Sequence, residues 1–176
     1  MDLNQFMQEV HENAVAHGWW DKERSDGTIR SLFHCELSEA MEAYRKGQPL
    51  YYVQEDGKPD GVAVELIDCC IRIMDYMANE KLPLLTGDPD EMMLKIVDSY
   101  VVEDGPVTDY ELPDFVAEMH DCITYFKEDN EPVWLDAVIG LCFAWVKERG
   151  VDPVAVMKEK HEYNKTRSYK HGGKVC

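Results

Sequence analysis

The sequence lacks both a long hydrophobic run and a hydrophobic leader. Its longest apolar stretch, Val133–Val146, is interrupted and shorter than the roughly 20 residues that a membrane helix needs. The first residues, Met1–Asn4, have neither the basic nor the apolar region of a signal peptide. At 176 residues, the chain is long enough for one ordinary domain with a buried core. We therefore expect a single cytoplasmic domain, residues 1–176, with no membrane partner.

Positive charge is scarce as well. The chain has 18 Lys and Arg residues against 35 Asp and Glu residues, a formal net charge of −17, which disfavours nucleic acid as a partner. Six of the cations nevertheless fall near the end of the chain: Lys158, Lys160, Lys165, Arg167, Lys170 and Lys174. Such a tail either holds an anion or is simply a solvated basic end.

The sequence has no C-x-x-C motif among its six cysteines. Cys69 and Cys70 are adjacent within a helical pattern, which is typical of neither a disulfide framework nor a zinc site. We expect reduced and mostly buried thiols.

Strand patterns are also missing, since apolar and polar residues never alternate over more than about four positions, so a sheet is not expected. Apolar residues recur instead with the 3.6-residue period of helices. Capping Asp and Pro residues and terminal glycines divide these stripes. The sequence therefore predicts an all-α bundle of about seven helices, at about residues 3–18, 26–46, 61–80, 88–103, 112–127, 130–150 and 152–167.

Two pairs of acidic residues stand out in this helical pattern: Glu36 with Glu39, and Glu65 with Asp68. Each pair is spaced i,i+3, so each projects two carboxylates from one face of a helix. The second pair lies in a markedly apolar helix, where carboxylates without a cation are costly. Oxygen ligands suit Mg²⁺ or Mn²⁺. Arg72, one turn after Asp68, is an alternative counter-ion that can pair with it with or without a metal.

These motifs resemble a known family. E-L-S-E at residues 36–39 and E-L-I-D at residues 65–68 are similar to the paired E-x-x-E and E-x-x-D motifs of the all-α nucleoside triphosphate pyrophosphohydrolases. This superfamily includes MazG-like proteins, dimeric dUTPases, dCTP pyrophosphatases and phosphoribosyl-ATP pyrophosphohydrolases. The tail, residues 160–174, resembles the K-x-x-x-N-x-x-R ending of MazG-like members. His11 and Trp20 stand where some dCTP-hydrolysing relatives place a histidine and a tryptophan around the nucleoside.

The resemblance implies a four-helix core that binds Mg²⁺, or Mn²⁺, and hydrolyses a nucleoside triphosphate to the monophosphate and pyrophosphate. It implies a house-cleaning role in the nucleotide pool and a homodimer. The implied metal ligands are Glu36, Glu39, Glu65 and Asp68, with Glu39, or else Glu36, orienting the attacking water. The implied substrate contacts are His11, Trp20, Arg72, Lys160, Asn164, Arg167, Lys170 and Lys174. Arg72 replaces an aromatic residue of the relatives, which leaves the base preference open.

The resemblance covers about residues 5–80 and 154–174, and residues 88–150 match nothing in it. This segment is either a helical insertion or a degenerate repeat, because the third helix overlays the sixth when shifted by 69 residues. In that overlay, Trp134 and Ala137 replace Glu65 and Asp68. The segment would then act as a pseudo-partner within the chain or enlarge a dimer contact.

Two other functions compete with hydrolysis. In the first, the chain is a non-catalytic acidic helical interaction module whose carboxylates face solvent. In the second, it is a di-metal carboxylate oxidoreductase, which would need E-x-x-H pairs. His34 and His120 do not stand at that spacing after a glutamate of the two acidic helices, which counts against redox chemistry.

Overall fold

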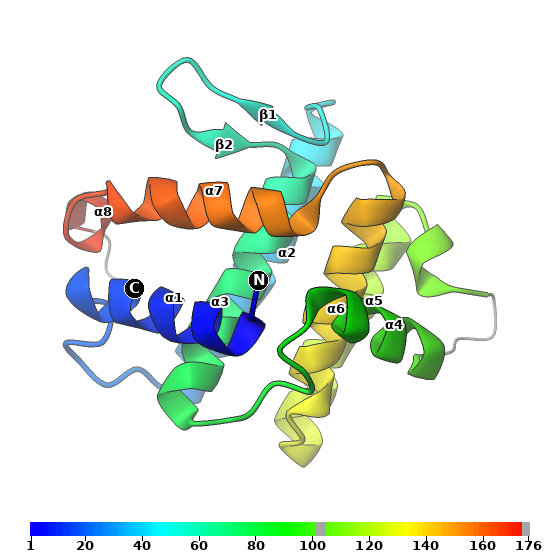
Figure 1. Ribbon diagram of the computed structural model, residues 1–176, viewed down its shortest axis with the longest axis horizontal. Coiled ribbons are helices and arrows are strands. Elements are labelled where there is room, and N and C mark those ends of the chain that lie inside the picture. Colours follow the sequence, from blue (N-terminus) through cyan, green and yellow to red (C-terminus); the bar gives the residue numbers. More distant parts are fainter. Residues whose placement is uncertain (101–104, 174–176) are drawn as a thin grey trace.

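The computed structural model describes residues 1–100 and 105–173, and confirms an all-α protein. Among these residues, no helix is both long and apolar enough to cross a membrane. The elements are α1 (Leu3–Ala16), α2 (Asp26–Arg45), β1 (Tyr52–Val53), β2 (Pro59–Asp60), α3 (Val62–Glu80), α4 (Pro89–Ser99), the 3₁₀ turn η1 (Val107–Asp109), α5 (Leu112–Asp129), α6 (Val133–Glu148), α7 (Pro153–Lys165) and α8 (Lys170–Gly173) (Figure 1).

Three details differ from the sequence-based expectation. The pair β1–β2 is a two-stranded antiparallel hairpin with Tyr52 opposite Asp60, and two residues per strand are too few to show an alternating pattern. Helix α4 ends at Ser99, because Tyr100 is already extended, whereas the sequence predicted helix to Glu103, which lies outside the described residues. The tail adds the short helix α8.

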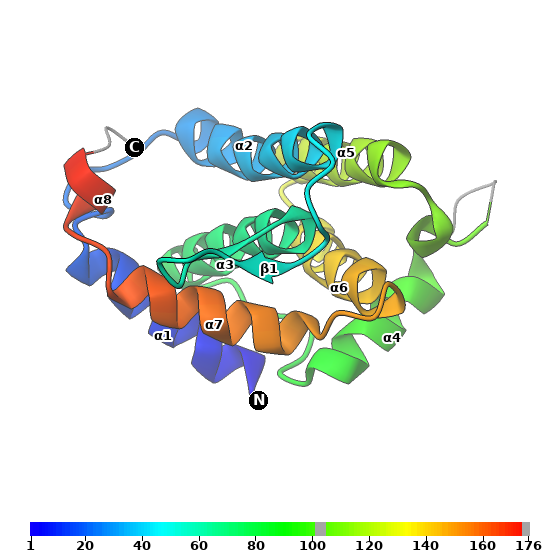
Figure 2. The ribbon, with the colours of Figure 1, turned by 90° about the horizontal axis from the view of Figure 1, so that it is seen from above.

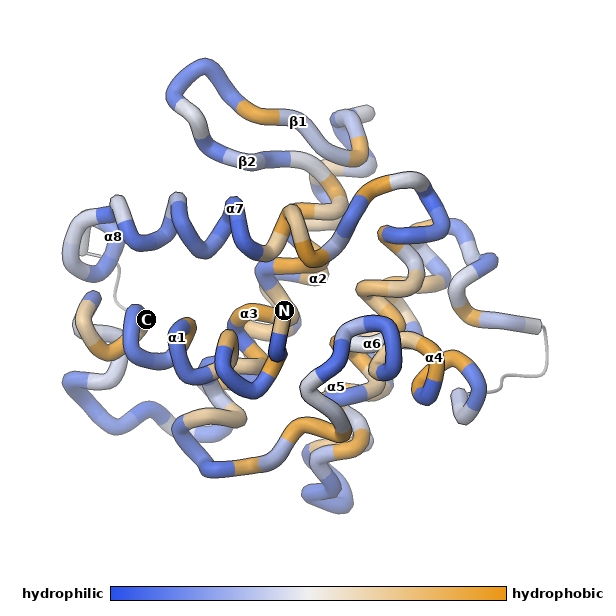
Figure 3. The backbone as a smooth tube through the Cα atoms, in the orientation of Figure 1, coloured by the Kyte–Doolittle hydropathy of each residue, from blue (hydrophilic) through white to orange (hydrophobic). Residues whose placement is uncertain are grey.

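The helices form three layers (Figure 2). Helices α3 and α6 lie in the middle, α2 and α5 cover one side, and α1, α7 and α4 cover the other. Both middle helices are buried around most of their circumference, which explains their nearly continuous apolar sequences. Figure 3 shows this contrast, with apolar colour along α3 and α6 and polar colour over much of α7.

The second half of the chain packs against the first. Helix α5 contacts α2, helix α6 contacts α3, and α4 covers α6. Where α2 meets α5, the rings of His34 and His120 stack, with their Nδ1 atoms 2.7 Å apart. The roles expected of this segment, as a pseudo-partner, a degenerate repeat or a dimer contact, stay predictions.

The start of α3 is held by a close backbone approach. Gly61 precedes this helix with φ +113°, and a Cβ there would come within 2.6 Å of the carbonyl oxygen of Pro49 and 2.8 Å of that of Leu50. The Ala63 amide donates to the Leu50 carbonyl over 2.8 Å. Only glycine fits this contact, which sets the position of the first turn of α3, including Glu65.

Candidate functional site: carboxylates beside a polar cavity

One polar stripe runs along the otherwise apolar α3. It consists of Glu65, Asp68, Arg72 and Asp75, whose spacings of three and four residues place them on one face. Helix α2 packs against α3 and brings Glu36 to this face. The site is therefore built where two helices meet.

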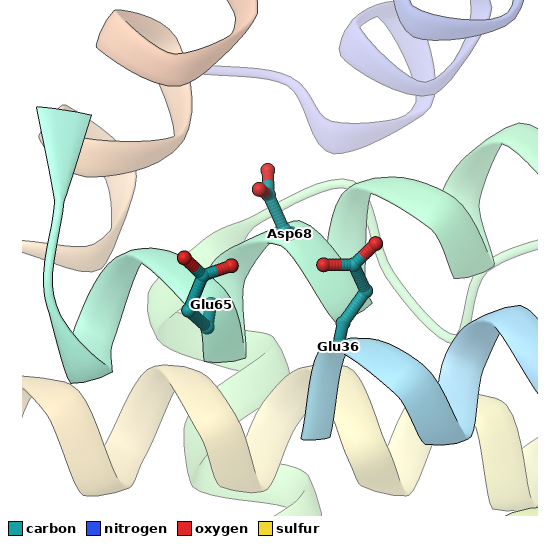
Figure 4. Close-up of side chains that lie close together, drawn as sticks. All are labelled: Glu36, Glu65 and Asp68. Carbon is teal, nitrogen blue, oxygen red and sulfur yellow. The ribbon is translucent and has the colours of Figure 1, made fainter. Parts of the chain in front are cut away.

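Glu36, Glu65 and Asp68 form a compact carboxylate cluster. Each offers an oxygen, and these atoms lie within 4.8 Å of one another. Figure 4 shows Glu65 and Asp68 projecting from α3 on one side, with the Glu36 side chain rising from α2 toward them. Glu36 and Glu65 are buried, at 5% and 8% exposure, and Asp68 is partly buried.

Two cations already face this cluster. The Arg72 Nε donates to Glu36, and the Lys160 Nζ lies 2.6 Å from Asp68. Lys160 comes from α7 and is only 3% exposed, so this ion pair links α7 to α3. Arg72 pairs with Glu36 and not with Asp68, the partner suggested by its helical spacing, although its charge also acts on Asp68. Two cations against three carboxylates leave one negative charge without a partner.

Glu65 is the carboxylate of the cluster that neither of these two ion pairs includes. Burial, followed by the charge of Asp68, raises the pKa of Glu65 to about 7, while Lys160 acts in the opposite direction. Burial also raises the pKa of Asp68 against the attraction of Lys160. Glu65 and Asp68 therefore hold their protons more tightly than ordinary carboxylates do, and a further cation would favour their ionised forms.

A polar cavity of about 90 Å³ adjoins the cluster. Helices α1, α2, α3 and α7 contribute to its wall, together with the loop after α1 and the C-terminal segment. The lining residues are Val10, Asn13, Ala14, Trp19, Glu36, Asp68, Ile71, Arg72, Asp75, His161, Asn164, Arg167 and His171.

Helix α7 presents two buried polar atoms to this region that have no hydrogen-bond partner within the described part of the chain, the Nε2 of His161 and the Oδ1 of Asn164. Burial lowers the pKa of His161, which favours the neutral ring. Because buried polar groups are costly when unpaired, these atoms are suited to hydrogen-bond a bound molecule.

His11 and Trp20 converge on Asp75. The His11 Nδ1 and the Trp20 Nε1 each lie 2.8 Å from its Oδ1, and the two rings meet edge to face. Burial raises the pKa of Asp75 even though both hydrogen bonds favour its ionised form. Neither His11 nor Trp20 lines the cavity, whereas the neighbouring Trp19 does.

The other predicted site residues divide into three groups. Asn164 and Arg167 line the cavity, and their contact with a substrate stays a prediction. Glu39 is exposed and outside the compact cluster, although its charge contributes to the raised pKa of Glu65. Lys170 does not line the cavity, and Lys174 lies outside the described residues.

Sequence reasoning missed several cavity residues. Asp75 is not one of them, because its spacing of seven residues from Asp68 already returns it to the same face, as a support of the site or a solvated acid. His161 lies beside Lys160, but nothing in its spacing shows that its Nε2 is buried without a partner. Trp19 and Asn13 carry no signal, because the turn after α1 decides which side chains face the cavity.

The donor set of the cluster fits a hard divalent cation. All three ligand groups are carboxylates, the chemistry that Mg²⁺ and Mn²⁺ prefer. Among the described residues, no histidine or cysteine belongs to this cluster. His34 and His120, whose positions count against the iron hypothesis, form a hydrogen bond with each other.

Comparison with known proteins finds no match: no protein-family model, no curated protein and no solved structure is significantly similar to this chain. The functional conclusion depends on the chemistry of the site.

Proposed function

We propose that this protein is a Mg²⁺-dependent nucleoside triphosphate pyrophosphohydrolase, which releases pyrophosphate and a nucleoside monophosphate. The observation that carries the proposal is the buried cluster of Glu36, Glu65 and Asp68, which has one more negative charge than its two facing cations neutralise. A cation-binding cluster beside a cavity with cationic and amide side chains suits a metal–polyphosphate substrate.

Each residue of the site has a role in this proposal. Glu36, Glu65 and Asp68 hold the metal, which when bound would neutralise charge on the phosphate oxygens. Lys160 and Arg167 attract the polyphosphate chain, because charge-assisted contacts to phosphate are strong. Glu39, exposed at the edge of the cluster, accepts a proton from the attacking water.

The nucleoside end of the substrate is assigned to the side of the cavity formed by Trp19 and Asn164. The Trp19 ring provides a stacking surface, which tolerates any base. The Asn164 Oδ1 has no partner and accepts a hydrogen bond from a sugar hydroxyl or a base. In this proposal, Asp75 fixes His11 and Trp20 behind the cavity wall. We also propose that the protein is a homodimer.

The test is an assay of the canonical ribo- and deoxyribonucleoside triphosphates with Mg²⁺ and with EDTA, resolving pyrophosphate, orthophosphate and monophosphate by chromatography. We expect metal-dependent release of pyrophosphate. Glu39→Gln should keep the fold and lose activity, because the amide is nearly isosteric but cannot take up the proton. Orthophosphate as the product, or full activity of this variant, would contradict the assignment.

The alternative is a non-catalytic interaction module, favoured by one specific observation: Arg72 and Lys160 already pair with Glu36 and Asp68. A site that is complete without metal predicts no stabilisation by divalent ions, whereas a metal site is stabilised by mass action. Absence of hydrolysis together with an unchanged Tm in Mg²⁺ or Mn²⁺ would establish this alternative.

A further inference from the structure

The C-terminal segment, residues 167–171, lies along the end of α1 and is called the strap below (Figures 1 and 2). The Lys170 amide donates to the His17 carbonyl over 3.0 Å, and the Tyr169 hydroxyl donates to Asp21. The His171 ring meets the Trp19 ring edge to face, with 5.1 Å between centroids. Contacts at three successive residues thus fasten the strap to the loop after α1.

The strap also depends on the missing side chain of Gly18. A Cβ at this position would lie 2.1 Å from Cε2 and 2.4 Å from Cζ of Tyr169. Gly18 has φ +78°, so it also ends α1 in the left-handed conformation that favours glycine. The Tyr169 ring therefore occupies the space that any other residue would fill.

His17 joins α1 to the strap through both ring nitrogens. Its Nδ1 lies 2.8 Å from the Asn13 carbonyl oxygen and its Nε2 lies 2.9 Å from the Arg167 carbonyl oxygen. A carbonyl oxygen only accepts, so a ring nitrogen donates in these contacts wherever it carries a proton. His17 is also the C-cap of α1, so its ring links the end of this helix to the strap.

The strap backbone is held in a costly conformation. Lys170 and His171 have φ +46° and +48°, the left-handed region that residues with a side chain rarely adopt. Such conformations persist only where surrounding contacts impose them. Loss of the contacts to α1 would therefore favour release of the strap.

The strap forms part of the cavity wall through Arg167 and His171, together with Asn13 and Trp19. With the strap in place, the cavity measures about 90 Å³, far below the roughly 300 Å³ or more of a typical small-molecule site. We propose that the strap is a cover of the carboxylate site, fastened to the end of α1 by His17 and by Tyr169 against Gly18, and released when these contacts are lost. This inference rests on the proposed function only in assigning a nucleotide to the cavity.

Trypsin tests the cover without any nucleotide, since it cleaves after Arg167 and Lys170 only when the strap is released. The cleavage rate in the intact protein is measured by mass spectrometry and divided by the rate for a free peptide of residues 160–173. His17→Ala removes both ring contacts, and the loss of about one hydrogen bond predicts roughly tenfold faster cleavage. A rate equal to that of the wild type would overturn the cover.

Docking of Tyr169 is tested by Gly18→Ala, with Gly47→Ala as the matched control. Both glycines follow the C-cap residue of a helix and have positive φ, +78° and +67°, but nothing lies within 4 Å of a Cβ at Gly47. Of the two glycine variants, only Gly18→Ala should show faster strap cleavage. Tyr169→Ala, which leaves the α1 backbone unchanged, should also show faster strap cleavage. Equal rates in these variants, Gly47→Ala and the wild type would refute the cover. Because no nucleotide is present, failure here is separate from failure of the hydrolase proposal.

Discussion

Replacing Glu65 by glutamine should stabilise the metal-free protein at alkaline pH and remove its response to Mg²⁺. Burial, reinforced by Asp68, raises the pKa of Glu65 from 4.5 to about 7. A folded-state pKa above the unfolded value means that the protonated group favours folding, and that this advantage is lost as the pH rises through the folded value. At one pKa unit per roughly 1.4 kcal/mol, ionised Glu65 costs the folded protein about 3 kcal/mol near pH 8 and under about 1 kcal/mol near pH 5.

Glutamine removes this charge but buries a polar amide, so we expect a net gain of about 2 kcal/mol near pH 8. For a chain of this size, that corresponds to a Tm increase of roughly 4–8 °C. Thermal unfolding of the wild type and Glu65→Gln at both pH values, each with and without Mg²⁺, measures this Tm increase and the response to Mg²⁺. Glu39→Gln, at an exposed position, is the control and should leave the metal-free Tm nearly unchanged.

Two results would refute this reasoning. An equal gain near pH 5 and pH 8 would show that the Glu65 carboxylate is not the source of the destabilisation. A Tm increase with Mg²⁺ as large in Glu65→Gln as in the wild type would show that the ion binds elsewhere.

Three further changes are expected to alter stability, each measured by urea unfolding. Lys160→Met should destabilise by about 3–5 kcal/mol, because it leaves the Asp68 charge buried without its partner; a loss under about 1 kcal/mol would contradict this. Asp136→Asn should stabilise by roughly 1–2 kcal/mol near pH 8 and less near pH 5, since burial raises the pKa of Asp136 to about 6. Gly140→Ala should cost about 1–3 kcal/mol, because its Cβ would lie 2.7 Å from Ile96 Cγ1 between α6 and α4; an unchanged midpoint would refute that packing.

The sequence alone was sufficient for the helices and for most of the acidic cluster. Apolar periodicity and capping residues are local signals, so helix ends such as Asp88 and Asp152 could be read directly. The i,i+3 spacing of Glu65 and Asp68 is equally local. It places both carboxylates on one face of α3 whatever packs against it.

Contacts between distant segments could not be read from spacing. Arg72 pairs with Glu36 on α2 and not with Asp68 on its own helix, and Lys160 on α7 pairs with Asp68. Glu39 shares a helical face with Glu36 but is exposed and stays outside the cluster, because the packing of α2 against α3 decides which carboxylate enters it. These pairings depend on how whole helices are placed, which no local pattern contains.

The sequence by itself determined the all-α class, the helix boundaries within a few residues and the candidate carboxylates, because these follow from periodicity and chemistry along the chain. Only the tertiary structure decided that Trp19 lines the cavity while His11 and Trp20 bond to Asp75. It alone placed the strap against His17, 150 residues away from Arg167 in the sequence. The physical reason is that burial and charge balance belong to a site assembled from distant segments, and they exist only once those segments have packed.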